Sequence, residues 1–64
     1  MEVSYKKLWK LLIDRDLKKN DLRRILSPST VNKLSHNKIV SLTVIIQICH
    51  FLRCDIGDII EITN

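Results

Sequence analysis

The side chains best able to do chemistry lie close together, in the eight-residue segment SPSTVNKL at residues 27–34. Ser29, Asn32 and Lys33 carry a hydroxyl, an amide and an ammonium group, and such groups bond to the base edges and phosphate oxygens of duplex DNA. The segment therefore predicts a helix that reads DNA in the major groove. A capped amphipathic surface helix without a partner is the simpler explanation of these eight residues taken alone.

The local sequence also marks where this helix begins and which side of it faces inward. Ser27 suits the N-cap position, because its hydroxyl accepts a hydrogen bond from a backbone N–H of the first turn. Pro28 suits the first helical position, where its missing N–H costs nothing. Val31 and Leu34 are three residues apart and share one face, which leaves the polar side chains outside. The helix is expected to end near residues 35–37, because asparagine tolerates the left-handed conformation that ends helices.

The basic side chains are concentrated around this predicted helix. Residues 18–38 hold six basic side chains against one acidic side chain, a net charge of +5. Residues 1–17 and 39–64 carry net charges of +1 and −2, and the 64-residue chain carries +4. A focused basic region favours a polyanionic partner through counterion release. A solvated basic surface is common, however, so the charge alone does not decide.

The other reactive side chains do not form a recognisable catalytic or metal site. Cys49 and Cys54 are too few for a disulfide framework or a four-ligand zinc site, even with His36 and His50 beside them. Cys49 also falls in an apolar stretch, where a free cysteine packs as a small hydrophobe. No carboxylate pair, nucleophile–base pair or phosphate loop has a recognisable spacing. We expect no catalytic residue, no metal, no cofactor and no enzyme activity.

Four further helices are expected to hold the 27–34 segment in place. Apolar spacing predicts helices over residues 4–15, 19–26 and 42–52, followed by a last short helix. Their N-caps are expected at Ser4, Ser41 and Asp55. The inward positions of the first two are Tyr5, Leu8, Trp9, Leu12, Ile13, Leu22, Ile25 and Leu26. Because the aromatic residues are read as core, none is left to stack on RNA bases.

Length and composition favour one small all-α domain over residues 1–64. The chain has one Gly and one Pro, which argues for helices joined by short loops. No apolar run approaches the roughly 20 residues that a membrane span needs, and no signal-peptide core is present. With reduced thiols, this favours a cytoplasmic protein. A small core cannot cover every C-terminal isoleucine, so a second copy is expected to pack on Ile56, Ile59, Ile60 and Ile62.

Three stretches together resemble the Cro-type, lambda-repressor-like helix-turn-helix (XRE) family. They are SYKKLWKLLIDRDLKKNDL at 4–22, SPSTVNKL at 27–34 and SLTVIIQICHFLRCDIGDIIEI at 41–62. The last matches the pattern at Cys49, Leu52, Cys54, Gly57 and Asp58. The resemblance implies a compact five-helix domain whose third helix, about residues 28–35, enters the major groove of double-stranded DNA. It also implies a homodimeric transcriptional repressor, with no small-molecule ligand evident.

The resemblance assigns contacts residue by residue. Base contacts are implied for Pro28, Ser29, Asn32 and Lys33. Phosphate contacts are implied for Lys18, Lys19, Arg23, Ser27, Thr30 and Lys38.

One departure affects these assignments. The connection from Leu22 to Ser27 is about two residues shorter than the family pattern and lacks its Gly. Two residues turn a helix by about 200°, so either the second helix ends early or the turn is tighter than usual. The alternative function is therefore an interaction or dimerisation module, or an antagonist, that has lost groove docking.

Overall fold

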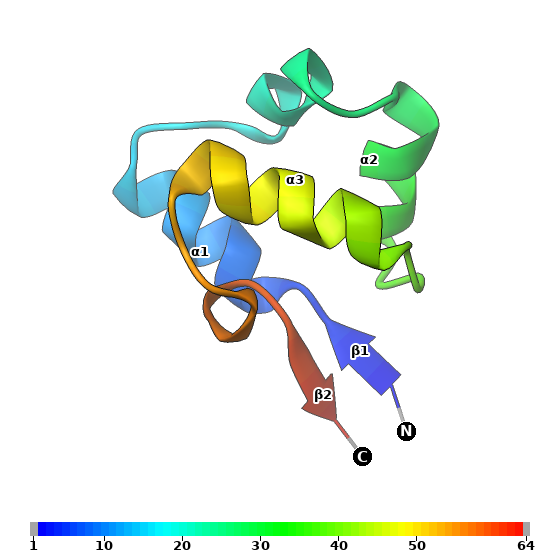
Figure 1. Cartoon of the computed structure of the whole chain (residues 1–64). Helices are drawn as coiled ribbons and strands as arrows, with labels where there is room; N and C mark the ends of the chain where they lie inside the picture. The colour runs from blue at the N-terminus through cyan, green and yellow to red at the C-terminus, as the bar shows by residue number, and fades with distance from the viewer. Residues whose placement is uncertain (1, 64) are drawn as a thin grey trace.

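Residues 2–63 are described by a computed structural model, in which helices form most of the chain. Three α-helices make up the body: α1 (Lys6–Asp14), α2 (Pro28–Ser35) and α3 (Leu42–Leu52). Two 3₁₀ helices, η1 (Lys19–Arg24) and η2 (Ile56–Asp58), lie before α2 and after α3. Two short strands, β1 (Glu2–Ser4) and β2 (Glu61–Thr63), complete the order (Figure 1). The domain is mostly helical, and the expectation of five α-helices is not confirmed.

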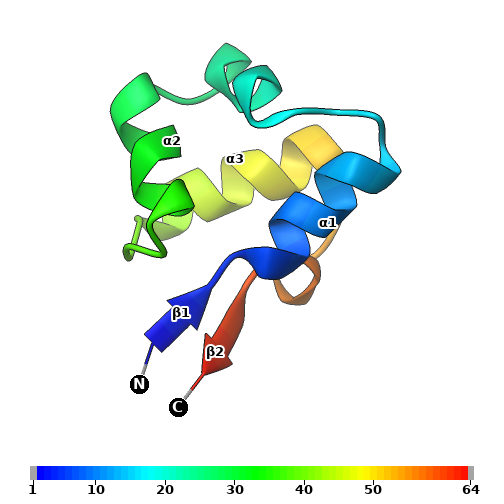
Figure 2. The ribbon, with the colours of Figure 1, turned by 180° about the vertical axis from the view of Figure 1, so that it is seen from behind.

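The two strands correct the all-α prediction. β1 and β2 form an antiparallel pair in which Val3 lies opposite Ile62. The pair brings the first and the last described segments of the chain side by side below the helices, as both views show (Figure 2). Ser4, expected as an N-cap, belongs to β1, so α1 begins two residues later than predicted. A strand of three residues at one end depends on a partner at the other end, and no local pattern indicates such a pairing.

The core lies where the three α-helices meet and follows most of the predicted apolar positions. Its buried members are Tyr5, Leu8, Leu12, Leu22, Leu26, Val31, Leu34, Ile45, Ile48, Leu52 and Ile59. Ile13 is a correction, because its side chain is 71% exposed. It lies about 100° around α1 from Leu12, outside the inward stripe. Trp9 is half-buried at the edge of the core.

The form of η1 explains how the short connection to α2 is accommodated. A 3₁₀ helix rises about 2.0 Å per residue, so the six residues of η1 span about 12 Å, the length of eight α-helical residues. η1 ends at Arg24, which is two residues earlier than predicted, and Leu26 donates its N–H to the Leu22 carbonyl. The early end and the longer rise of η1 fit the short connection that the sequence predicts, and Leu22 and Leu26 reach the core.

The α3 prediction is confirmed at both ends. The helix spans Leu42–Leu52, and the Ser41 hydroxyl accepts a hydrogen bond from the Val44 N–H at 3.3 Å. At its C-terminus Arg53 is left-handed, with φ of 53°, and Cys54 N–H bonds back to the Cys49 carbonyl. No helix within residues 2–63 combines the length and apolar character that a membrane span requires.

Alkaline pH is expected to destabilise the fold through Cys54. Burial raises the pKa of this thiol from 9.0 to about 11, and the neighbouring Cys49 thiol adds to the effect. Between these two pH values the unfolded chain gives up the proton and the folded chain keeps it, so the free energy of unfolding falls as pH rises. Urea titrations under reducing conditions, from below pH 9 to about pH 11, measure this fall.

Cys54→Ser is the matched control, because serine does not titrate in this range. We expect the variant to lose stability less steeply than the wild type over the same interval. Part of the fall will remain, because burial also raises the pKa of Tyr5. Equal slopes for the two proteins would contradict the assignment to Cys54.

Candidate nucleic-acid interface

Helix α2 has the start and the inward face that the sequence predicts. The Ser27 hydroxyl accepts a hydrogen bond from the Thr30 N–H at 3.3 Å, and Pro28 is the first helical residue. Val31 and Leu34 are buried, 6% and 0% exposed, and hold the helix on the core. The helix ends as predicted, because Asn37 follows the C-cap with a φ of 54°.

The opposite side of α2 presents the four residues predicted to contact bases. Pro28, Ser29, Asn32 and Lys33 are all exposed. They therefore share a surface that the other described residues, within 2–63, leave open. His36, which the sequence reasoning did not assign, joins this surface. Its Nδ1 lies 2.8 Å from the Asn32 carbonyl oxygen, so its exposed ring stands beside the last turn of the helix.

Four of the residues predicted to contact phosphates are exposed on the segments that come before and after α2. Lys18, Lys19 and Arg23 are exposed on or next to η1, which packs against α2 (Figure 1). Lys38 is exposed on the loop at the other end of α2. Thr30 is only partly exposed. Its hydroxyl lies 3.0 Å from that of Ser27, so these two hydroxyls act together at the helix start.

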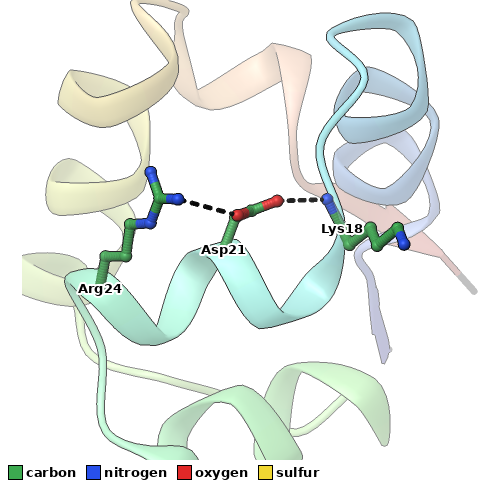
Figure 3. A network of polar contacts seen from close by, with 3 residues as sticks. All are labelled: Lys18, Asp21 and Arg24. Carbon is green, nitrogen blue, oxygen red and sulfur yellow. Dashed lines mark hydrogen bonds and ion pairs between the residues drawn. The ribbon is translucent and has the colours of Figure 1, made fainter.

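Local contacts decide which cations near η1 are available to a ligand. Asp21 caps η1 by accepting a hydrogen bond from the Lys18 N–H at 2.8 Å, and its other oxygen lies 3.5 Å from Arg24. The ammonium group of Lys18 points away from this carboxylate (Figure 3). The Lys19 ammonium lies 4.5 Å from the centre of the Trp9 ring, a cation–π contact that orients it. Asp21 therefore partly neutralises Arg24 and leaves Lys18 available.

Tyr5 fixes the loop that carries Lys38, a role that sequence reasoning missed. Its hydroxyl donates to the Lys38 carbonyl at 2.7 Å, and its N–H donates to the Asn37 side-chain oxygen at 3.3 Å. Burial raises the pKa of the Tyr5 phenol, which favours the protonated donor. The partners are 32 and 33 residues apart, so only the folded chain reveals the link.

The predicted dimer residues do not share one exposed surface. Ile59 is 0% exposed in a single chain, so its assignment to an interface is corrected: the side chain completes the core. Ile60 is half-buried against the same core. Ile56 and Ile62 are exposed, but Ile62 lies in β2 and not in the predicted helix.

The thiols and imidazoles do not gather into a metal site among residues 2–63. Cys49 and Cys54 are both free and half-buried. No group of three or more His, Cys, Asp or Glu side chains in this part of the chain is placed to hold an ion. The exposed surface over α2, η1 and the Lys38 loop is therefore the site on which the functional argument rests.

Comparison with known proteins agrees with this geometry. Residues 7–64 match the family model described as a Cro/C1-type HTH DNA-binding domain. The chain is also similar to the crystal structure of the transcriptional regulator VanUg, Form II, with 61% sequence identity and a TM-score of 0.90. That match covers 94% of this chain and 83% of the other. A search of curated proteins gave no match.

Proposed function

The chain belongs to the Cro/C1-type helix-turn-helix DNA-binding domain family, and from this premise we propose that it is a transcriptional repressor that docks α2 in the major groove. The similarity to a transcriptional regulator supports the regulatory part of the proposal. The observation that carries the rest is the division of α2 into two sides. Val31 and Leu34 hold the helix on the core, while Asn32 and Lys33 are exposed next to Ser29.

Asn32 and Lys33 are the residues that we propose read the bases. An asparagine amide can donate to and accept from adenine N7 and N6, and a lysine ammonium donates to the guanine acceptors O6 and N7. Ser29 and Pro28 lie one turn earlier, where the helix enters the groove. Removing Lys33 should therefore affect specific binding more than removing a basic residue elsewhere.

The basic residues on either side of α2 supply the affinity in this proposal. Lys18, Lys19 and Arg23 would contact one phosphate backbone, and Lys38 the other. The hydroxyls of Ser27 and Thr30 would approach phosphate at the helix start. Neutralising four phosphates per chain, and so eight per homodimer, gives a slope of about −7 for the logarithm of the dimer's binding constant against that of salt concentration. The proposed active form is a homodimer, whose two α2 helices would lie about 34 Å apart on a palindromic site.

A second function, as an interaction module without DNA binding, is favoured by one observation. Large apolar side chains are exposed on elements other than α2, among them Ile46 on α3 and Ile62 in β2. Strong self-association without retention on heparin would indicate this function. Retention on heparin that moderate salt abolishes would favour the DNA-binding proposal, because counterion release is lost at high salt.

A selection of bound sites from random duplexes, followed by titration at several salt concentrations, tests the proposed function. We expect a selected site with two related halves and a specific complex whose affinity falls with salt at the slope given above. A chain that selects no sequence and forms no specific complex even at low salt would refute the proposal.

A further inference from the structure

We propose that Cys49 and Cys54 together form a binding site for a trivalent arsenical, a compound whose arsenic atom bonds to two thiols at once. Cys49 lies in the last turn of α3, and Cys54 follows the left-handed residue Arg53 that ends the helix. Both thiols are free and half-buried, and both line one open hollow with His50 and Asp58. We call them the thiol pair. The inference concerns the turn after α3 and does not depend on DNA binding.

The way in which α3 ends brings the two cysteines together. The Cys54 N–H donates a hydrogen bond to the Cys49 carbonyl oxygen at 3.0 Å, and Arg53 between them is left-handed. This closure is a Schellman motif, in which the side chains of the two bonded residues are commonly in contact. With standard backbone dimensions, one such bond holds the two Cα atoms within about 7 Å. That is the upper end of the range over which a disulfide can form, so an additional atom between the sulfurs has room to join them.

The surroundings of Cys54 keep its thiol protonated at neutral pH. Burial is the main cause that raises the pKa of this thiol to about 11, and the Cys49 thiol and the Asp58 carboxylate add to the rise, while Arg15 opposes it. The influence of Cys49 also shows that the two thiols face each other. Thiolate is the form that attacks peroxides and alkylating agents, so a protonated thiol reacts poorly with them. The thiol pair is therefore suited to a ligand that accepts a protonated thiol.

The number of donors selects among ligands that prefer sulfur. Within residues 2–63 no third His, Cys, Asp or Glu completes a set that could hold a metal ion, so the four ligands that Zn²⁺ prefers are not assembled. A trivalent arsenic atom with one carbon substituent and two hydroxyls has two positions to exchange, and two thiols fill them. Two As–S bonds form, two As–O and two S–H bonds break, and two water molecules leave. Arsenic stays trivalent, so the step needs no oxidant, and the thiol protons leave in the water.

Contacts from α1 hold the turn that carries the thiol pair. The Arg15 guanidinium donates to the Leu52 carbonyl oxygen at 2.6 Å, and the Lys7 ammonium donates to the Gly57 carbonyl oxygen at 3.2 Å. η2, which follows the turn, packs against both α1 and α3 (Figure 1). A turn that is fixed before the ligand arrives loses little conformational freedom on binding. It also disfavours a disulfide at this place, because direct bonding of the sulfurs would require more movement than a bridge through arsenic.

Titration of the whole reduced chain with phenylarsine oxide, followed by native mass spectrometry, tests the proposal. We expect one adduct per chain, heavier than the protein by one phenylarsine unit less two hydrogens. Cys49→Ser and Cys54→Ser should each raise the dissociation constant by about 10²–10⁴-fold, because the second As–S bond can no longer form within one chain. Ethanedithiol should remove the arsenical from the wild type, and glutathione at the same thiol concentration should not, because only the former supplies two linked thiols.

A variant with the same number of thiols separates the geometry of the turn from the cysteine content. Cys49→Ser combined with His50→Cys moves one thiol by a single position, about 100° around α3. His50 is exposed, so the helix should form as before, and circular dichroism checks this. In native buffer we expect a dissociation constant at least about tenfold above that of the wild type, because both bonds must form at once. In denaturing urea the two constants should become similar.

The same measurements define what would overturn the proposal. A wild type that binds phenylarsine oxide no more tightly than Cys54→Ser would do so, because one thiol would then suffice. Equal native affinities for the wild type and the variant with the shifted thiol would also do so, as would two arsenicals on one chain. Binding by the wild type that occurs only in urea would show that the folded turn does not present the thiol pair.

Discussion

Replacing Leu34 with alanine is expected to lower the free energy of unfolding by about 2–5 kcal/mol. Leu34 is fully buried on α2, so the change deletes three carbons from the core and leaves a cavity. A 64-residue domain has a total stability of only about 3–10 kcal/mol. We therefore expect a variant that is largely unfolded at physiological temperature, and that loses DNA binding because α2 loses its attachment.

Ile13→Ala is the matched control for this prediction. Ile13 is also an apolar helical residue, but its side chain is 71% exposed, so its truncation is expected to cost within about 0.5 kcal/mol. Urea denaturation followed by Trp9 fluorescence and by circular dichroism measures both changes. A loss below about 1 kcal/mol in Leu34→Ala, or equal losses in both variants, would show that α2 is not held as described.

Replacing Lys33 with alanine is expected to weaken binding to the selected site by about 1–3 kcal/mol, or roughly 5- to 150-fold. The side chain is exposed on the outer side of α2, so its removal leaves the core unchanged. If Lys33 contacts a base, the loss will be greatest on the selected sequence and the preference at one position will relax.

Lys10→Ala removes the same charge from α1, where Lys10 is exposed but away from α2. We expect it to change specific binding by less than about threefold, because the side chain would make no contact with DNA. Fluorescence anisotropy with a labelled duplex, on selected and scrambled sequences, measures both variants. Equal losses for Lys33→Ala on the two sequences would mean that Lys33 contacts phosphate and not a base.

Neither the loss of stability in Leu34→Ala nor the loss of DNA binding in Lys33→Ala can be inferred from composition, because both depend on where α2 lies. The charge of +5 over residues 18–38 is the same whether or not the outer side of α2 is accessible. In the structure η1 winds tightly and packs beside α2 without covering Asn32 or Lys33. The shortened connection therefore does not bury the proposed reading surface, which is the point that the sequence left open.

Sequence alone determined the two helices that matter most to the proposal, α2 and α3. Ser27, Pro28 and Ser41 act on backbone groups within three residues of themselves, and the apolar spacing of Val31 and Leu34 fixes which side faces inward. These are local effects, so they do not depend on where the segment lies in the fold. The basic character of the region around α2 was equally visible.

Only the tertiary structure decided what depends on distant partners. The pairing of Val3 with Ile62, the link from Tyr5 to Lys38, and the burial of Ile59 join residues far apart in the chain. Local pattern cannot distinguish a buried isoleucine from an exposed one when both belong to one apolar run. A small core has room for only some of the apolar side chains in such a run. In the structure Ile59 is buried in the core and Ile62 is exposed, so Ile59 does not belong to the predicted dimer interface.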